Sequence, residues 1–519
     1  MSTLGRRNDT KVRANFDEFR QQWPSWSWLQ DRLRKSGLEP TSAKELRPGE
    51  SRGSWVILAK PADVLVKHFE LAPEVIVLCA PWKAMQAKDI ERTEAVFKSE
   101  IRVDPGFALV ISGDPDAEAR LRAVVPDDRK YLFVTADMFE SKTDPQSFLH
   151  DLLCDMLGRR RLFDLRPPAM GSQFFGRENE LEALERDVLN GHCLGVFGLR
   201  KVGKTSLLRR VAQKFRDAKP EARRVIPVEV DLQEIPYNRR SLAGAVGLIG
   251  QQLDREIARA KIQLPVAERD PLDRLVQTAE HVEREMGARV LLILDEYEVL
   301  LGGRIPSSDG VELLTWLRGL AQGHAKAFSL VLAGRNSRLL APARIGGADN
   351  PMYRFLRSVP LAGLTPEDCR SMVRKIGGRM ALRFNHDALQ LIVEETGGHP
   401  ALVRTLGDLI DQHVPVSERN PAVVNAATVT HVLPRFSREV VEDMRELLDA
   451  ANDFDPHGSD YLIHLAYEVP WIGGSSEALV DDALVGYGIL TRDTHAFRIG
   501  CLATWVRNNY AFPQKAAHG

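Results

Sequence analysis

The sequence predicts a multidomain α/β protein built around a parallel sheet, and three observations lead to this prediction. The chain has 519 residues, which is too long for a single hydrophobic core and suits about three or four domains of ordinary size. Short apolar runs alternate with longer segments of helical character, as strands and their crossover helices do in a parallel sheet. A glycine-rich loop joins one of these apolar runs to a helical segment.

Composition and charge exclude several classes of protein. Hydrophobic residues make up 44% of the chain and charged residues 27%, which is typical of globular proteins and excludes collagen-like and disordered chains. The 70 basic and 71 acidic side chains give a net charge of −1, so no global field would attract a nucleic-acid backbone or an anionic membrane.

Segments that would place the chain in a membrane or an oxidising compartment are also missing from the sequence. No stretch reaches the ~18 apolar residues of a membrane-spanning helix, and no apolar stretch follows the basic N-terminal residues. We therefore expect a cytoplasmic protein. The five cysteines are odd in number and far apart, which favours reduced, mostly buried thiols over disulfides or a zinc cluster.

Residues 1–157 are predicted to form an N-terminal α/β module, to which no role is assigned. Its expected strands lie at 55–58, 75–78, 107–111 and 131–134. A linker is predicted at 158–171, where arginines at 159–161 precede two prolines that would interrupt a helix. The arginines could touch a phosphate backbone, but a solvated hinge is the favoured interpretation.

Two groups of residues in the N-terminal module have alternative interpretations. Trp23, Trp26 and Trp28 fit either a stacking surface for bases or a short helix docked on its own domain, and docking is favoured. Asp114 and Asp116 follow the third apolar run, where α/β folds often place ligand-binding residues. A Gly-Asp-Pro-Asp turn explains these two acids equally well, so they are not assigned to an active site.

A stronger alternation predicts a second α/β domain, the core, at 172–361. Its expected strands lie at 193–197, 225–230, 290–294 and 328–333. No further strands are expected until the final domain. Thr365 has the character of a helix N-cap and is followed by Pro366, so we expect a helical lid at 362–416 and a last domain at 417–519.

The loop Gly198-Leu199-Arg200-Lys201-Val202-Gly203-Lys204-Thr205 matches the phosphate-binding motif G-x-x-x-x-G-K-[ST]. Its glycines let the backbone curl, so that successive N–H groups and the positive end of the next helix surround a phosphate. Lys204 is expected to reach the β- and γ-phosphate oxygens, and the Thr205 hydroxyl is expected to ligate Mg²⁺. The predicted nucleotide-binding positions of the loop are Gly198, Lys201, Val202, Gly203, Lys204, Thr205 and Ser206.

Polar residues at the ends of two further strands are the other candidates for the site. Asp295 ends the apolar run 290–294 and is the expected second anchor of the metal, while Glu296 is the expected base for the attacking water. Arg335 follows the next strand and either contacts the γ-phosphate or lies exposed in a loop. Arg354 and Arg357 are weaker candidates for charge-neutralising fingers, within the chain or towards a neighbouring subunit.

Three motifs in order resemble those of the archaeal-type ATPases of the STAND class, which are relatives of AAA+ proteins. The motifs are Phe174-Phe175-Gly176-Arg177-Glu178-Asn179-Glu180-Leu181, the phosphate loop, and Gly397-Gly398-His399-Pro400. The resemblance covers about residues 172–510. It implies that the backbone of Phe175, Gly176 and Arg177 lies against adenine and that Pro400 packs near the base or ribose.

The resemblance also implies a winged-helix domain after the lid, with helices at 461–467 and 475–485 and a two-stranded wing at 489–499. Residues 431–519 carry seven bases against thirteen acids, a balance of 7 − 13 = −6, which disfavours binding to a DNA backbone. We therefore favour a domain that packs on the ATPase core over a domain that binds DNA.

Together these features predict a switch that binds and hydrolyses ATP with Mg²⁺, in signalling or defence, and couples the nucleotide state to domain rearrangement or assembly. The expected partner is another protein or a second copy of the chain. Two alternatives remain open: a DNA-associated AAA+-like loader or motor, and a nucleotide-gated scaffold with little hydrolysis.

Overall fold

The computed structural model of the protein describes residues 16–512, apart from 47–52, 70, 83, 101, 126–129, 159–160, 165–168, 170–173, 220–221, 236–240, 265–267, 302–304, 336–343, 346–347, 454–455, 470 and 472–476. The chain forms two compact units. Unit 1 contains Met1–Asp164, Ser371–Leu389 and Gly407–Thr430. Unit 2 contains Leu165–Arg370, Gln390–Leu406 and His431–Gly519.

The N-terminal module of unit 1 contains a mixed five-stranded sheet in the order β1-β2-β3-β4-β5. Its strands are β1 (Leu38–Glu45), β2 (Trp55–Pro61), β3 (Glu74–Ala80), β4 (Val103–Ser112) and β5 (Lys130–Thr135). The four predicted strands are confirmed, but only β3, β4 and β5 are parallel, and β2 is antiparallel to both of its neighbours. The sequence missed β1 because this edge strand, LEPTSAKE, has no apolar run and is broken by a bulge after Pro40.

Helices cover this sheet and complete the core of the module. They are α2 (Leu29–Lys35), α3 (Asp63–Phe69), α4 (Ala87–Ser99), α5 (Ala117–Leu121), α6 (Ala136–Ser141) and α7 (Pro145–Gly158). Trp26 is 6% exposed in the core, and Trp23 and Trp28 pack against it, which confirms docking as the role of the tryptophan cluster. Asp114 is buried and accepts two hydrogen bonds from Arg120, which fits the turn interpretation.

Unit 2 contains an all-parallel five-stranded sheet in the order β12-β6-β9-β8-β7. Its strands are β6 (Leu194–Phe197), β7 (Val225–Asp231), β8 (Arg289–Asp295), β9 (Phe328–Gly334) and β12 (Arg357–Pro360). The four predicted strands are confirmed. The sequence missed β12 because it has only four residues and no apolar run. Both edge strands contain a proline, Pro227 in β7 and Pro360 in β12, as edge positions allow.

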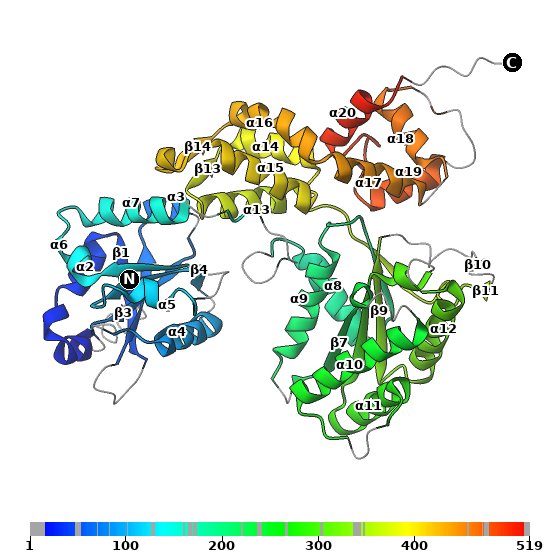
Figure 1. The fold of residues 1–519 in the computed structure, drawn as a ribbon, viewed down its shortest axis with the longest axis horizontal. Helices are drawn as coiled ribbons and strands as arrows, with labels where there is room; N and C mark the ends of the chain where they lie inside the picture. The colour runs from blue at the N-terminus through cyan, green and yellow to red at the C-terminus, as the bar shows by residue number, and fades with distance from the viewer. Residues whose placement is uncertain are drawn as a thin grey trace, which may run out of the picture. The chain divides into compact units, whose positions relative to one another are not determined.

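Five helices flank this sheet (Figure 1). They are α8 (Glu178–Leu189), α9 (Lys204–Arg216), α10 (Leu242–Ala260), α11 (Pro271–Met286) and α12 (Ser307–Gly323). Helix α8 packs on α9, and α10 packs on α11 and α12, so the sheet is buried between helical layers as a parallel sheet requires.

The segment after the sheet is mainly helical. Its helices are α13 (Pro366–Gly378), α14 (His386–Thr396), α15 (Pro400–His413) and α16 (Ala426–Glu439). The division between the two units falls within each of these four helices. Contrary to the expectation that no strand occurs here, β13 (Leu382–Phe384) pairs in parallel with β14 (Ala422–Val424) in unit 1. Each strand has three residues, too few to give a periodic signal.

The C-terminal part of unit 2 contains α17 (Val441–Asn452), α18 (Gly458–Ala466), α19 (Glu477–Gly486) and α20 (Gly500–Asn509). Between the last two helices, the chain turns back in a hairpin with a single antiparallel bridge, Leu490 to Phe497. This hairpin stands where the sequence predicts a two-stranded wing, so the predicted pairing is reduced to one bridge in the described residues. The winged-helix assignment stays a prediction.

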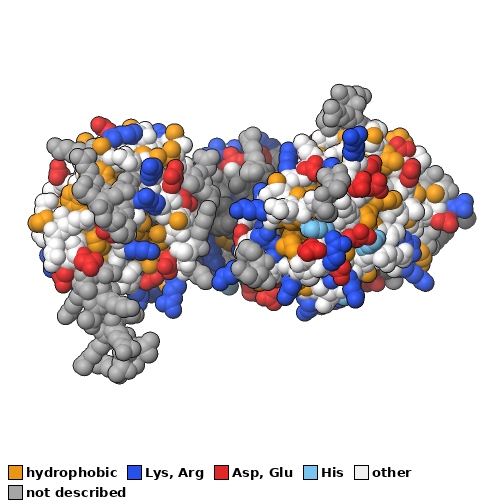
Figure 2. All heavy atoms as spheres, turned by 90° about the horizontal axis from the view of Figure 1, so that it is seen from below, with side chains coloured by type: hydrophobic (Ala, Val, Ile, Leu, Met, Phe, Trp, Pro, Cys, Tyr) orange, Lys and Arg blue, Asp and Glu red, His pale blue; other side chains and the backbone are white. Residues whose placement is uncertain are grey.

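Three further expectations can be compared with the described residues. All five cysteines are free thiols, and four of them are buried. None of the described helices is both long enough and apolar enough to cross a membrane. Basic and acidic side chains are interspersed over the face in Figure 2, in keeping with the net charge of −1.

Candidate nucleotide-binding site

The phosphate loop connects β6 to the first residue of α9. Gly203 is the N-cap of this helix and has φ of 103°, a conformation that strains any other residue. No side chain caps the helix, so its first N–H groups and the positive end of its dipole are available to an anion. The local geometry is that of a phosphate cradle.

Lys204 is the buried cation of this cradle. Its side chain is 6% exposed, and its ammonium donates to the carbonyl oxygens of Gly198 (2.9 Å) and Leu199 (3.0 Å). Burial lowers the pKa of Lys204, and the nearby carboxylates, Glu296 foremost, oppose this shift. The Lys204 ammonium therefore lies close to the carboxylates of Asp295, Glu296 and Glu298.

Thr205 and Asp295 meet at one corner of the site, as the sequence predicts. The Thr205 hydroxyl donates to Oδ2 of Asp295 across 2.5 Å, and Asp295 is 6% exposed. Burial raises the pKa of this carboxyl, and the hydrogen bond from Thr205 opposes the shift. A hydroxyl and a carboxylate are oxygen donors of the kind that Mg²⁺ prefers, so the two residues fit the metal.

Glu296 and Glu298 follow Asp295 on the same loop. Glu296 has φ of 58° and is half-buried, and its N–H donates to Oδ1 of Asp295 across 3.0 Å. Glu298 accepts a hydrogen bond from the backbone N–H of Arg335. Glu298 was not among the predicted site residues, although its place three residues after Asp295 was a signal that a third acid joins this group.

The predicted adenine-side segment lies against the phosphate loop. Gly176 and Arg177 both have positive φ, 63° and 70°. Arg177 is 6% exposed and donates to the carbonyl oxygens of Val202 (3.2 Å) and Ala362 (2.5 Å). It also forms an ion pair with Glu180 at 3.0 Å. The structure thus brings Arg177 to the phosphate loop, and the predicted contact of residues 175–177 with adenine stays a prediction.

His399 contacts the phosphate loop directly, and Pro400 follows it in the chain. Pro400 begins α15, and His399 is 4% exposed and donates from Nε2 to the Arg200 carbonyl across 3.0 Å. Burial lowers the pKa of His399 to about 4, although this hydrogen bond opposes the shift. A small cavity here is lined by Leu199, Arg200, Arg335, His399, Leu402, Asp443, Glu446, Leu447 and Ala450.

Three basic side chains, of which Arg200 and Arg335 line this cavity, pair with acids of the C-terminal region. Arg200 lies 2.7 Å from Glu446, Lys201 lies 2.7 Å from Asp443, and Arg335 lies 2.8 Å from Asp453. The acids belong to α17 and to its C-cap residue. We call these three ion pairs the α17 clamp. At the level of the sequence, these acids entered only the net charge of residues 431–519, and no contact was predicted for them.

The remaining predicted residues lie apart from this cavity. The Ser206 hydroxyl accepts a hydrogen bond from the backbone N–H of Ala169 at 2.9 Å. Arg357 forms an ion pair with Asp187 at 2.9 Å, and the guanidinium of Arg354 lies 5.2 Å from the ring centre of Tyr353. The structure therefore gives both finger candidates local partners within unit 2.

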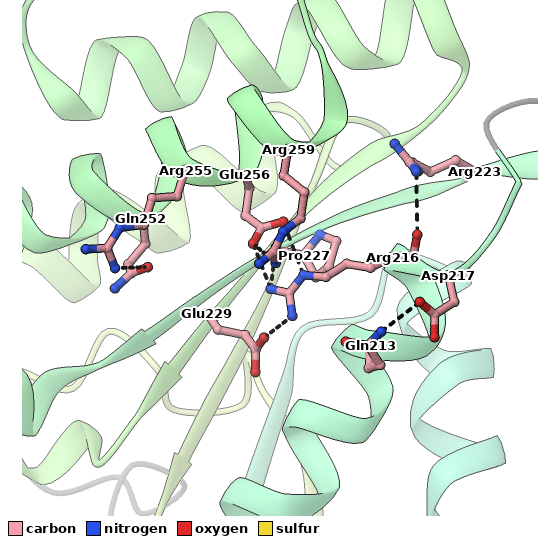
Figure 3. Close-up of polar contacts among 10 residues, drawn as sticks. All are labelled: Gln213, Arg216, Asp217, Arg223, Pro227, Glu229, Gln252, Arg255, Glu256 and Arg259. Atoms are coloured by element: carbon pink, nitrogen blue, oxygen red, sulfur yellow. Dashed lines mark hydrogen bonds and ion pairs between the residues drawn. The ribbon is translucent and has the colours of Figure 1, made fainter. Parts of the chain in front are cut away.

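A cleft of about 350 Å³ opens beside Thr205 and Asp295, between α9, β7 and α10. Figure 3 shows the buried network at its far end, where the guanidinium of Arg216 bridges Glu229 and Glu256. Arg216 also donates to the carbonyl of Pro227 at 3.4 Å, and Arg259 pairs with Glu256 at 2.8 Å. The network fixes the end of α9 to β7 and α10, and sequence periodicity gave no sign of it.

Comparison with known proteins adds a family match and a set of fold likenesses. Residues 168–412 match the model of the family described as Novel STAND NTPase 1. A Walker-type ATPase of Pyrococcus abyssi is similar, with 17% identity, a TM-score of 0.48, and coverage of 67% of this chain and 99% of that chain. The ORC1 protein of Aeropyrum pernix, solved in complex with DNA, has 16% identity, a TM-score of 0.36, and coverage of 68% and 97%.

The RuvB Holliday junction branch migration motor of Thermotoga maritima has 16% identity, a TM-score of 0.33, and coverage of 65% of this chain and 95% of that chain. No curated protein matches the chain. The parallel sheet with its phosphate loop, the acids that end β8 and the family match agree with one another, and they identify the chain as a multidomain P-loop NTPase.

Proposed function

We propose that the protein is a STAND-type switch that binds and hydrolyses ATP, and that the α17 clamp couples its nucleotide state to the C-terminal region. One observation carries the proposal. Three basic side chains in or beside the phosphate loop, Arg200, Lys201 and Arg335, are each paired with an acid of α17 or its C-cap. A negative phosphate and a negative helix would therefore compete for the same cations.

The residues of the site have distinct roles in this proposal. The loop N–H groups and Lys204 bind the phosphates, while Thr205 and Asp295 hold Mg²⁺. When bound, the magnesium ion neutralises charge on the β- and γ-phosphate oxygens. The charge of Glu296 opposes the lowering of the Lys204 pKa, so the two side chains are close to each other. In this proposal Glu296 orients a water and accepts its proton.

The strength of the clamp suits a switch. Arg200, Lys201 and Arg335 keep 52%, 58% and 37% of their side-chain surface exposed, so each pair contributes only about 0.2–1 kcal/mol. Three such pairs would contribute about 0.6–3 kcal/mol in total, which overlaps the range of roughly 1–3 kcal/mol typical of the coupling free energy between two sites. Contacts of this size can form and break with the nucleotide state.

The first experiment tests nucleotide binding and hydrolysis. Lys204→Ala should abolish ATP binding in a calorimetric titration, and unchanged affinity would refute the site. Glu296→Gln should preserve binding and slow phosphate release, whereas equal turnover would remove Glu296 as the base. Glu442→Gln, on the exposed face of α17, serves as the control because Arg445 is its only charged partner among the described residues.

The second experiment separates the switch from its alternatives. The Glu296→Gln protein is purified in the presence of ATP, and the molecules that copurify with it are identified. A protein partner or self-association that disappears with ADP supports the switch. Nucleic acid that stimulates ATP turnover and binds more tightly at low salt would instead support the DNA-associated ATPase.

A further inference from the structure

The hinge between the sheet and the lid is the segment 361–365, which connects β12 to α13. Two arginines donate to three successive carbonyl oxygens of this segment. Arg177 donates to Ala362 at 2.5 Å, and Arg498 donates to Gly363 at 3.3 Å and Leu364 at 2.8 Å. Arg498 comes from the C-terminal hairpin, more than 130 residues later in the chain.

Arg498 also reaches the Gly-Gly-His-Pro motif. Its Nε donates to the carbonyl oxygen of Gly397 at 3.0 Å, and the backbone N–H of Leu364 donates to Gly398 at 2.8 Å. Gly397 has φ of 57°, and a Cβ atom there would lie 2.7 Å from the Arg498 carbonyl. One side chain therefore connects the hairpin, the hinge and the loop that precedes His399.

The environment of Arg498 makes this connection specific to a guanidinium. Its described contacts are backbone carbonyls, and burial, followed by the charge of Arg177, lowers its pKa. A guanidinium presents five donors in a fixed plane and can bind three carbonyls at once, whereas a lysine ammonium is a point charge on a flexible chain. The contacts thus depend on shape as well as on charge.

We infer that Arg498 is a positioning residue that holds the hinge and the Gly-Gly-His-Pro motif closed and thereby limits the rate of nucleotide exchange. The inference rests on the proposed nucleotide binding. The hinge that Arg498 contacts also accepts a hydrogen bond from Arg177, which donates to Val202 of the phosphate loop. Gly397, which Arg498 also contacts, lies two residues before His399, whose ring donates to Arg200 of the same loop. Without the Arg498 side chain, the hinge keeps the hydrogen bond from Arg177 to Ala362. It loses the two hydrogen bonds that Arg498 donates to Gly363 and Leu364.

The experiment measures dissociation of a fluorescent ADP analogue from the full chain and hydrogen exchange at 361–365 and 397–400. Arg498→Ala and Arg498→Lys should both speed dissociation roughly tenfold and increase exchange at both segments, within the range expected for coupled sites. Arg507→Ala is the matched control, since Arg507 also donates to a backbone carbonyl, that of Ala466, but does not reach the hinge. Arg507→Ala should leave the dissociation rate of the ADP analogue and the hydrogen exchange at 361–365 and 397–400 unchanged.

Unchanged dissociation in Arg498→Ala, or equal acceleration in Arg507→Ala, would overturn the inference. If the alanine variant does not fold, the lysine variant decides the question, and full wild-type behaviour in it would show that charge alone suffices and overturn the inference. A wild-type protein that binds no ADP would contradict the proposed function instead, so the two failures are distinguishable.

Discussion

The α17 clamp gives the sharpest prediction. The perturbation is the double variant Asp443→Asn and Glu446→Gln, which removes the carboxylates paired with Lys201 and Arg200 while keeping the size of each side chain. The matched control is Glu442→Gln with Asp449→Asn, which removes two negative charges from exposed positions of the same helix. Any effect of net charge on nucleotide affinity is therefore common to both variants.

The expected magnitude follows from exposure. The two basic partners are 52% and 58% exposed, so water and salt screen each pair to about 0.2–1 kcal/mol. Two pairs give about 0.4–2 kcal/mol, or roughly a 2- to 30-fold change in the equilibrium between clamped and released α17. Since the clamped state withholds Arg200 from the phosphates, we expect ATP turnover to rise by a factor within this range.

Salt provides an independent readout of the same contacts. The Debye length falls from about 10 Å at 0.1 M to about 3 Å at 1 M salt, so salt should weaken the clamp in the wild-type protein. Turnover of the wild type, measured by phosphate release, should therefore rise with salt towards that of the double variant, whose own profile should be flatter. Identical turnover and salt profiles in the double variant, the control and the wild type would refute the reasoning.

Three further predictions concern the metal corner, the Arg216 network and His399. Asp295→Asn should greatly weaken the Mg²⁺ dependence of ATP binding measured by calorimetry, because one of the two oxygen ligands loses its charge; unchanged dependence would contradict the assignment. Arg216→Met should lower the free energy of unfolding by about 1–3 kcal/mol, because half-buried Glu229 would lose its partner and Glu256 would keep only Arg259, whereas Arg255→Met, on the exposed side of the same cleft, should change it little in a denaturant titration. Stability should fall as the pH drops from about 6.5 to about 4, because the unfolded chain takes up a proton that buried His399 refuses, and His399→Gln should remove up to about 3 kcal/mol of this dependence at ~1.4 kcal/mol per unit of pKa; an unaltered pH profile in that variant would argue against a neutral buried ring.

Sequence reasoning predicted the parts of the site that are local in the chain. A phosphate loop of eight residues and the acids after β8 carry their chemistry in their spacing, and the structure brings Lys204, Thr205 and Asp295 together. The strands with long apolar runs were also predicted correctly, because an apolar run is a local feature of the sequence. Strands β1, β12 and β13 were missed because they are short or bulged, and tertiary pairing defines them.

The contacts between distant segments could not be predicted in the same way. Arg200 and Glu446 are 246 positions apart, and Arg498 lies 134 positions from Leu364. A single charged residue on an exposed helix face looks the same whether it meets solvent or a partner. For Arg335, the position directly after β9 was predicted correctly. Its ion pair with Asp453 could not be predicted, because it depends on how α17 packs.

The proline in β7 has a consequence for how this molecule associates with others. An edge strand normally offers free donors and acceptors that can recruit a strand from another chain. Pro227 has no N–H to offer, and the guanidinium of Arg216 already occupies its carbonyl. Growth of the sheet into a fibre is therefore disfavoured along this side, and recruitment of further copies would have to use helices and side chains.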